Sequence, residues 1–245
     1  AFPSWARTVP GLEAFATGAL ELRDAGNGFG LGVFATKLVE PGQTLLSVPF
    51  SLCVTADSVD SDPAFRERLQ AGMLACGSQV PLPPRLRLWL YLVHAHLDPR
   101  APQHGFLQLC PQQFEDPAWW SEDELSELQG TNLLATVRRE QRVLAKQFAR
   151  HVQPLTEACP EHFPPSVFSL RRLTWARSLW TSRAFPRFLA GPSASSKAPC
   201  SAGGRLAMAL GGALLPVLDF CNHRRGINTE YVVGPSAAGL QLVLP

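Results

Sequence analysis

The sequence predicts an α+β fold in which two groups of short strands flank a helical block. Residues 19–56 alternate apolar and polar side chains between turn residues, which is typical of half-buried strands. Residues 57–185 have helical periodicity, and strand patterns return at about 206–220 and 228–244. If both β parts belong to one sheet system, the helices are an insertion, and the chain divides into three segments: 1–56, 57–170 and 171–245.

The N-terminal strands are separated by turn residues. Ala19–Arg23 alternates and is followed by Asp24–Gly28, a segment rich in glycine, aspartate and asparagine. Gly30–Ala35 is the next strand, and the turn Glu40–Gln43 precedes a third strand at Thr44–Pro49. We therefore expect a small meander of short strands.

The middle of the chain predicts helices. Arg85–Leu97 is rich in leucine and aromatic residues, so it must be largely buried. Ser121 and Glu124 have the spacing of a capping box, and Gly130 interrupts the helix that begins there. A later helix begins at Ser166 and ends before Pro186. Four basic side chains lie away from the apolar face of the helix after Gly130, and we interpret them as a solvated face rather than a binding stripe: Arg138, Arg139, Arg142 and Lys146.

Composition excludes several classes of function. A net charge of +2 is too small to indicate nucleic acid, and no apolar run approaches the ~20 residues of a membrane helix. The six cysteines are far apart and form no C-x-x-C pair, which predicts reduced thiols in an intracellular protein. The chain opens without methionine and closes on an alternating apolar run, so we expect it to be a fragment.

Near the end of the chain, the apolar run Leu214–Leu218 leads into the polar cluster Asp219-Phe220-Cys221-Asn222-His223. Polar groups at the end of a buried segment need hydrogen-bond partners, and a ligand is one source of them. The alternative is a core strand whose last residues turn into solvent. A metal site at Asp219, Cys221 and His223 lacks a fourth ligand, so we predict no metal.

Three segments occur in a distinctive order: Gly30–Thr36, Thr181–Phe185 and Asp219–His223. Together they resemble the SET-domain methyltransferases, in the class of the RuBisCO large-subunit lysine methyltransferase and the actin histidine methyltransferase. The resemblance extends from about residue 19 to 245. A dinucleotide-binding interpretation of Gly30-x-Gly32 is rejected, because no strand-plus-helix phosphate context surrounds it. The resemblance implies a SET-type core of short antiparallel strands with a helical insertion.

The resemblance also implies S-adenosyl-L-methionine as cofactor and a role for each matching position. Phe29, Gly30 and Leu31 would lie against the cofactor, while Asn222 and His223 would hold its adenine and amino-acid ends. Three further residues complete the implied site: Arg183 would bind the methionine carboxylate, Asp219 would orient the strand end, and Phe185 would line the substrate channel. Without the other motifs, Arg183 would be interpreted as a surface arginine at a helix end.

The implied partner is a protein substrate, with lysine preferred over histidine as the methyl acceptor; we expect a monomer in cytoplasm, nucleus or chloroplast that binds neither nucleic acid nor membrane. No catalytic residue is identified, because the family's tyrosine is missing and the two tyrosines present, Tyr91 and Tyr231, lack its context. Either the chain is an incomplete record of an active enzyme, which we favour, or it is a natural short form. The rival hypothesis is a non-catalytic interaction module.

Overall fold

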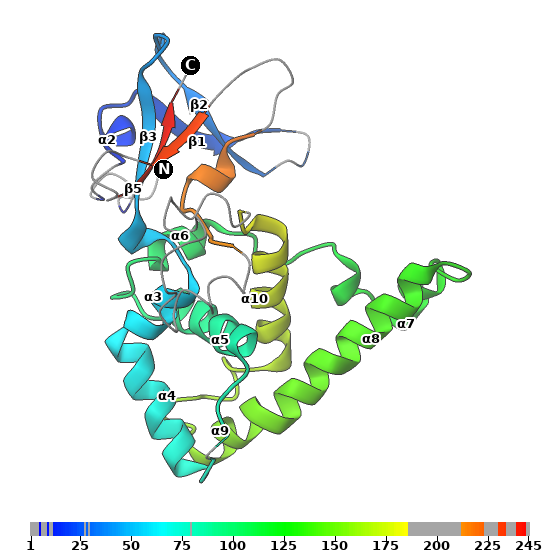
Figure 1. Ribbon diagram of the computed structural model, residues 1–245. Helices are drawn as coiled ribbons and strands as arrows, with labels where there is room; N and C mark the ends of the chain where they lie inside the picture. Colours follow the sequence, from blue (N-terminus) through cyan, green and yellow to red (C-terminus); the bar gives the residue numbers. More distant parts are fainter. Residues whose placement is uncertain are drawn as a thin grey trace, which may run out of the picture. The chain divides into compact units, whose positions relative to one another are not determined.

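The computed structural model describes residues 5, 9, 12–26, 28, 30–78, 80–185, 212–222, 230–233 and 239–243. The chain divides into two compact units, which we call the strand unit and the helical unit (Figure 1). The strand unit comprises Ala1–Thr55, Pro99–Gln108 and Ala184–Pro245, and the helical unit comprises Ala56–Asp98 and Leu109–Arg183. Within the described residues, no helix is long and apolar enough to cross a membrane.

The strand unit contains an antiparallel hairpin of β1 (Leu20–Asp24) and β2 (Leu31–Ala35). Its turn is closed locally, because the Gly26 amide donates to Asp24 Oδ1 at 2.8 Å. The Ala25 amide donates to the Gly30 carbonyl at 2.7 Å. The two strands and the turn predicted between them are confirmed.

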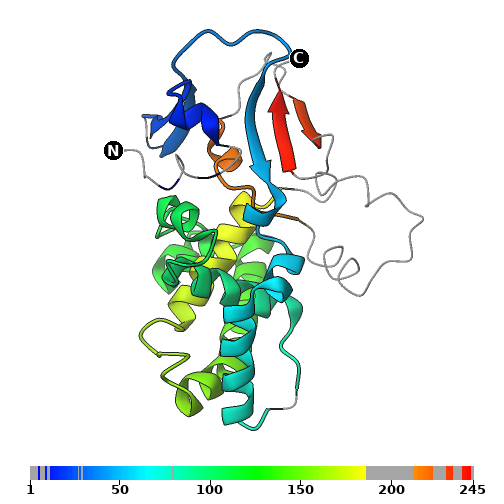
Figure 2. The same ribbon diagram turned by 90° about the vertical axis from the view of Figure 1, so that its left-hand side faces the viewer.

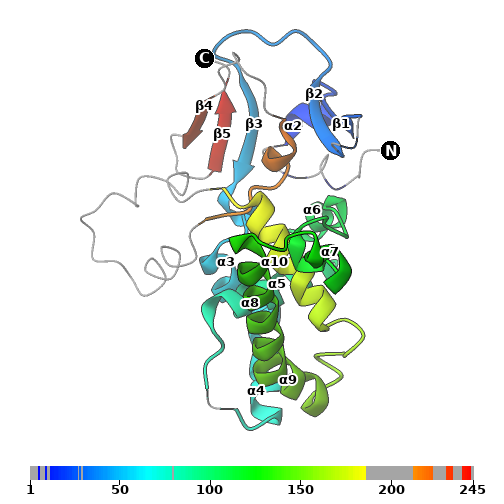
Figure 3. The same ribbon diagram turned by 90° about the vertical axis from the view of Figure 1, so that its right-hand side faces the viewer.

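The third strand does not continue this hairpin. β3 (Thr44–Pro49) pairs with β5 (Gly239–Val243), which also pairs with β4 (Glu230–Val233), so that the antiparallel sheet has the order β3-β5-β4 (Figure 3). The predicted N-terminal meander was therefore wrong. Its third strand finds a partner near the other end of the chain, which local sequence patterns do not reveal. The C-terminal strand segment at 228–244 is confirmed as β4 and β5.

The described part of the predicted strand at 206–220 is not a strand. Ala213 and Leu214 make single antiparallel bridges to Phe185 and Val54. The chain then turns at Pro216 and enters a 3₁₀ turn, η6 (Leu218–Phe220). An apolar run cannot be assigned to strand or turn by its hydrophobicity alone, because both are buried here. Residues 206–211 lie outside the described residues.

One apolar cluster holds the strand unit together. It combines the short helix α2 (Glu13–Ala16), the 3₁₀ turn η1 (Phe50–Leu52), the sheet strand β3 and the segment leading into η6. Its buried members are Leu12, Phe15, Leu20, Leu46, Val48, Leu52, Cys53, Ala213, Leu215, Val217 and Leu218. α6 (His104–Leu109) adds Phe106, whose ring meets Phe220 edge-on with centroids 5.9 Å apart. The segments that carry the predicted site are thus part of the core.

The helical unit is built on α5 (Pro84–Leu97) and α10 (Leu170–Arg183), which pack side by side (Figure 1). The burial predicted for Arg85–Leu97 is confirmed, since Leu86 and Leu90 are almost fully buried. α10 begins four residues later than predicted. The remaining elements are α3 (Ala56–Ser61), α4 (Pro63–Ala75), η2 (Pro117–Trp119), α7 (Glu122–Ser126), α8 (Asn132–Gln147), η3 (Phe148–Val152) and α9 (Gln153–Ala158).

The helix boundaries of this unit follow from capping. Ser121 and Glu124 form the predicted capping box at the start of α7, which satisfies two backbone amides reciprocally. Gly130 has φ +84° between α7 and α8, as an interruption there requires. The basic face of α8 is solvated as predicted: Arg139, Arg142 and Lys146 are exposed, and Arg138 pairs with Glu122 at 2.6 Å.

Candidate functional site

Two of the predicted segments lie together in the strand unit. The turn η6, orange in Figure 2, contacts β2 of the hairpin. Gly32 on β2 lies beside Asn222, two residues beyond η6. A Cβ atom placed on Gly32 would lie 2.7 Å from Asn222 Nδ2. Segments from opposite ends of the chain therefore form one surface.

Gly32 is required by this close approach. It is buried, and an added Cβ would also lie 3.1 Å from the Phe34 ring and 3.3 Å from Ala25 Cβ. A Cβ atom cannot lie as close as 2.7 Å to an amide nitrogen. Any side chain at position 32 would therefore displace the Asn222 amide. The Asn222 side chain itself is exposed, which leaves its amide accessible to a ligand.

The residues before β2 form the second part of this surface. Gly30 is exposed with φ +72°, a conformation that glycine adopts readily and other residues avoid. Leu31 is half-buried and pairs with Asp24 across the hairpin. Leu31 is thus the first residue of the strand that contacts η6, and Gly30 immediately precedes it. Phe29 and His223 lie outside the described residues.

Backbone strain marks the start of η6. Val217 has φ +70° and ψ −38°, which is an outlier for a β-branched residue, and its side chain is 1% exposed. Such a conformation costs on the order of 1–3 kcal/mol and persists only where packing imposes it. Here Leu218 and Phe220 are buried on either side of Asp219. Strained residues of this kind cluster at ligand sites, because they hold neighbouring groups in one orientation.

Asp219 in η6 and Cys221 just after it influence one another electrostatically. Asp219 is half-buried, and its amide donates to the Leu215 carbonyl at 3.3 Å. Burial, aided by the Asp219 carboxylate, raises the pKa of the Cys221 thiol to about 12. Cys221 is therefore protonated at neutral pH and is a poor nucleophile. It serves as a packing group in this site.

Phe185 is tied by its backbone to the segment that leads into η6. Its amide donates to the Ala213 carbonyl at 2.8 Å, and the Ala213 amide donates back at 3.2 Å. A Cβ on Gly212 would lie 2.5 Å from the Phe185 carbonyl oxygen, so this contact also requires glycine. Phe185 is half-buried and packs against the core of the strand unit.

The other predicted residues belong to different surroundings. Arg183 is the last residue of α10 and falls in the helical unit, so its role at the cofactor stays a prediction. Tyr91 lies in the core of the helical unit, with its ring 5.4 Å from Phe65, and burial and the Asp62 carboxylate raise its pKa. It is a packing residue. Tyr231 lies in β4.

Known proteins share the sequence pattern of this chain. No family model matches it. It is 26% identical over 212 residues to the [fructose-bisphosphate aldolase]-lysine N-methyltransferase of Arabidopsis thaliana, an alignment that covers 86% of this chain and 38% of that protein. It is 25% identical over 247 residues to the N-lysine methyltransferase SETD6 of Bos taurus, covering 100% of this chain and 50% of that protein. It is 24% identical over 202 residues to the actin-histidine N-methyltransferase of Canis lupus familiaris, an alignment that covers 82% of this chain and 31% of that protein.

Solved structures share its fold. The SET domain of LSMT bound to lysine and AdoHcy is 21% identical, with a TM-score of 0.64 over 94% of this chain and 48% of that chain. Rubisco LSMT bound to sinefungin and monomethyllysine is 24% identical, with a TM-score of 0.62 over 92% of this chain and 44% of that chain. The chain is similar in sequence to N-methyltransferases and shares the fold of the SET-domain structures. The predicted resemblance and the α+β class are confirmed. The chain spans between 30% and 38% of the length of three of the curated proteins that it matches.

Sequence reasoning missed the contacts that shape the candidate site. Gly32, Gly212 and Val217 were not singled out, although each fixes the course of the backbone there. Gly32 was considered only within the pattern Gly30-x-Gly32; its place inside a strand pattern, where glycine often marks close backbone approach, was a further signal. Gly212 and Val217 carried no signal, because their importance depends on partners that are distant in sequence.

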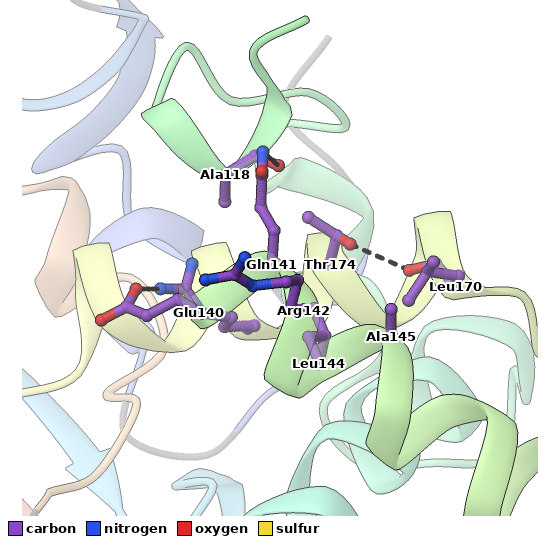
Figure 4. Close-up of a pocket in the computed structure, with 9 residues that line it drawn as sticks. Ala118, Glu140, Gln141, Arg142, Leu144, Ala145, Leu170 and Thr174 are labelled. Atoms are coloured by element: carbon purple, nitrogen blue, oxygen red, sulfur yellow. Dashed lines mark hydrogen bonds and ion pairs between the residues drawn. The ribbon is translucent and has the colours of Figure 1, made fainter. Parts of the chain in front are cut away.

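Two hollows in the helical unit were also not predicted. They have volumes of about 360 and 370 Å³ and share Ala118, Glu140 and Arg177 as lining residues. Figure 4 shows the smaller of the two, with Ala118 and Glu140 among its labelled residues. Gln141 fastens η2 to α8 by donating from Nε2 to the Pro117 carbonyl at 3.3 Å. Arg177 is paired with Glu140. Because these two charges neutralise one another, we place no cofactor in the hollows.

Proposed function

We propose that this chain carries the cofactor-binding part of an S-adenosylmethionine-dependent protein methyltransferase that acts on a lysine side chain. The observation that carries the proposal is the contact between Gly32 and Asn222, which joins the two segments expected to hold the cofactor. The curated relatives support it, because those compared above are all named as N-methyltransferases, two for lysine and one for histidine.

The residues present fit S-adenosylmethionine. Gly30 is exposed and has open space where a side chain would lie, so a flat ligand can approach the backbone closely there. The exposed amide of Asn222 offers two donors and one acceptor, which matches the mixed hydrogen-bonding edge of an adenine ring. Asp219 orients this segment from within η6. We assign Phe29 and His223 to the same site on the resemblance alone, and Arg183 to the methionine carboxylate.

The chemistry expected at this site needs little from the protein beyond alignment. The cofactor supplies a methyl group on a sulfonium, which is already a good electrophile. The residues of the chain must place an acceptor nitrogen in line with it and exclude water. Phe185 would provide an apolar wall, and desolvation there lowers the pKa of an entering lysine amine toward its neutral, nucleophilic form. The Cys221 thiol does not compete, since its raised pKa keeps it protonated.

The finer architecture belongs to the same proposal. β3, before the helices, pairs directly with β5, which follows them. This pairing supports the interpretation that residues 57–170 are a helical insertion in a SET-type core. A monomeric state and an intracellular location in cytoplasm, nucleus or chloroplast also stay predictions.

The reaction is tested by methyl transfer. S-Adenosylmethionine carrying an isotopically labelled methyl group is incubated with the protein and an extract of acceptor proteins, and the labelled proteins are hydrolysed to amino acids. We expect label in methyllysine. Label in methylhistidine would show that the acceptor is histidine and would leave the proposed methyl transfer unchanged. Cofactor binding without any label would favour a non-catalytic interaction module.

A further inference from the structure

A group of three metal-binding side chains lies outside the cofactor site, at the end of α9 in the helical unit. Among the residues that the structure describes, Cys159, Glu161 and His162 place one ligand atom each within 4.8 Å of one another. The Cys159 thiol donates a hydrogen bond to Glu161 Oε1 at 3.1 Å. Cys159 is 2% exposed, His162 is half-buried and Glu161 is exposed, so the group opens to solvent on one side.

The backbone that carries these residues is a tight turn. The amides of His162 and Phe163 both donate to the Cys159 carbonyl, at 3.1 and 2.8 Å. Pro160 lies between the ligands and restricts the chain before folding, because its ring fixes φ. The three side chains are therefore held together by local geometry, and a ligand that bridges them would lose little backbone freedom on binding.

The turn is also anchored to α4. Arg68 donates from Nη1 to the His162 carbonyl at 2.6 Å. Phe163 is fully buried, and a Cβ on Gly72 of α4 would lie 2.5 Å from its ring. This contact requires glycine at position 72, one helical turn from Arg68 on the same face of α4, and adds a second anchor for the turn. The ligand group thus sits on a rigid support, which is what a metal site needs.

We propose that Cys159, Glu161 and His162 form a binding site for Zn²⁺ with a fourth position left for water. Thiolate, imidazole and carboxylate are the three ligand types that zinc takes in proteins, and it binds them tetrahedrally. Tetrahedral zinc sets neighbouring ligand atoms about 3.5 Å apart, given bond lengths of about 2.0–2.3 Å. The 3.1 Å between the sulfur and Glu161 Oε1 is already close to this. The accessible side chains of Glu161 and His162 can rotate to shorten the other distances between ligand atoms, which are at most 4.8 Å.

The charges of the site balance. Zinc replaces the thiol proton of Cys159, which leaves to solvent, and the thiolate and carboxylate then neutralise the two positive charges of the ion. Because the ion would bind the folded turn and not the unfolded chain, it would fasten the end of α9 and stabilise the helical unit. Sequence spacing did not indicate this site, since C-x-E-H is not a zinc-finger pattern.

The site is tested by titrating the whole chain with Co²⁺, which substitutes for zinc and absorbs visibly when bound by a thiolate in tetrahedral geometry. We expect one ion per chain, a thiolate-to-metal absorption band, and loss of that band when Zn²⁺ is added. The thermal midpoint should rise with Zn²⁺ and fall again with a chelator. Removing a ligand should weaken metal binding by at least about tenfold, because the loss of a mere hydrogen-bond partner of a metal ligand typically weakens binding that much.

Matched variants distinguish this site from adventitious binding. Cys159→Ser and His162→Gln should each weaken binding, whereas Cys110→Ser and His151→Gln change the same residue types elsewhere in the helical unit and should not. His162→Gln serves if Cys159→Ser fails to fold, because His162 is only half-buried. Absence of the thiolate band at millimolar Co²⁺ would overturn the proposal. So would bands of equal strength in the wild type and His162→Gln. Neither result depends on methyl transfer.

Discussion

At the scale of single residues, the candidate site depends on side chains that are absent as much as on those present. Gly32 leaves the space in which the Asn222 amide lies, and Gly30 adopts a left-handed conformation just before β2. The buried Val217 accepts a strained backbone at the start of η6. Of these features, Gly32 allows the Asn222 amide to lie beside the hairpin, where we expect the cofactor.

A double-mutant cycle tests this arrangement. Gly32→Ala puts a Cβ 2.7 Å from the Asn222 amide and must displace it, so we expect S-adenosylmethionine affinity to fall about tenfold, the equivalent of one lost hydrogen bond. Asn222→Ala should cause a similar loss. Because both changes remove the same contact, the double variant should bind no more weakly than the Asn222→Ala variant.

The measurement is equilibrium binding of the cofactor to the four proteins of the cycle. Circular dichroism of each variant controls for folding, since Asn222 is exposed and its replacement should leave stability unchanged. Fully additive losses would show that Gly32 acts through some other partner. No loss in either single variant would remove both residues from the site.

The positions of these residues were predicted from motifs, but their physical roles were not. Gly30, Leu31, Asp219 and Asn222 were singled out, and the structure places β2 and η6 in contact. The reason that position 32 must be glycine is an atom of Asn222, far along the chain. Local sequence reasoning has no means of finding such a partner.

At the scale of elements, predictions succeeded where the signal was local. The β1–β2 hairpin, the capping box of α7 and the burial of α5 follow from turn residues, cap spacing and apolar periodicity. They failed where pairing is distant. β3 has its partner in β5, and the apolar segment before η6 is a pair of bridges followed by a turn. Strand pairing between chain ends leaves no mark in a local window.

The segment at Phe185 and Ala213 yields an element-scale prediction. Gly212→Ala would push a Cβ to 2.5 Å from the Phe185 carbonyl oxygen and force apart the two backbone hydrogen bonds of this bridge. We expect a loss of about 1–3 kcal/mol in the free energy of unfolding, as overpacked sites typically show. Urea unfolding monitored by circular dichroism measures it. Unchanged stability would mean that this bridge contributes nothing to holding η6.

At the scale of the whole molecule, the chain consists of a strand unit that carries the candidate cofactor site and a helical unit that carries the proposed metal site. The resemblance predicted from three ordered motifs is confirmed by relatives that align along most of the chain. No motif alone was specific enough to identify the family. Their order along the chain carried the information, because it reflects how the chain ends meet in one fold.

We propose above all that this chain binds S-adenosylmethionine through the surface shared by β2 and η6. Calorimetric titration of the cofactor into the folded chain tests this claim most directly. We expect saturable binding that is weakened about tenfold or more by Asn222→Ala and by Arg183→Ala, and that is unchanged by Arg139→Ala, an exposed arginine on α8. No heat at millimolar cofactor, from a sample shown to be folded, would contradict it.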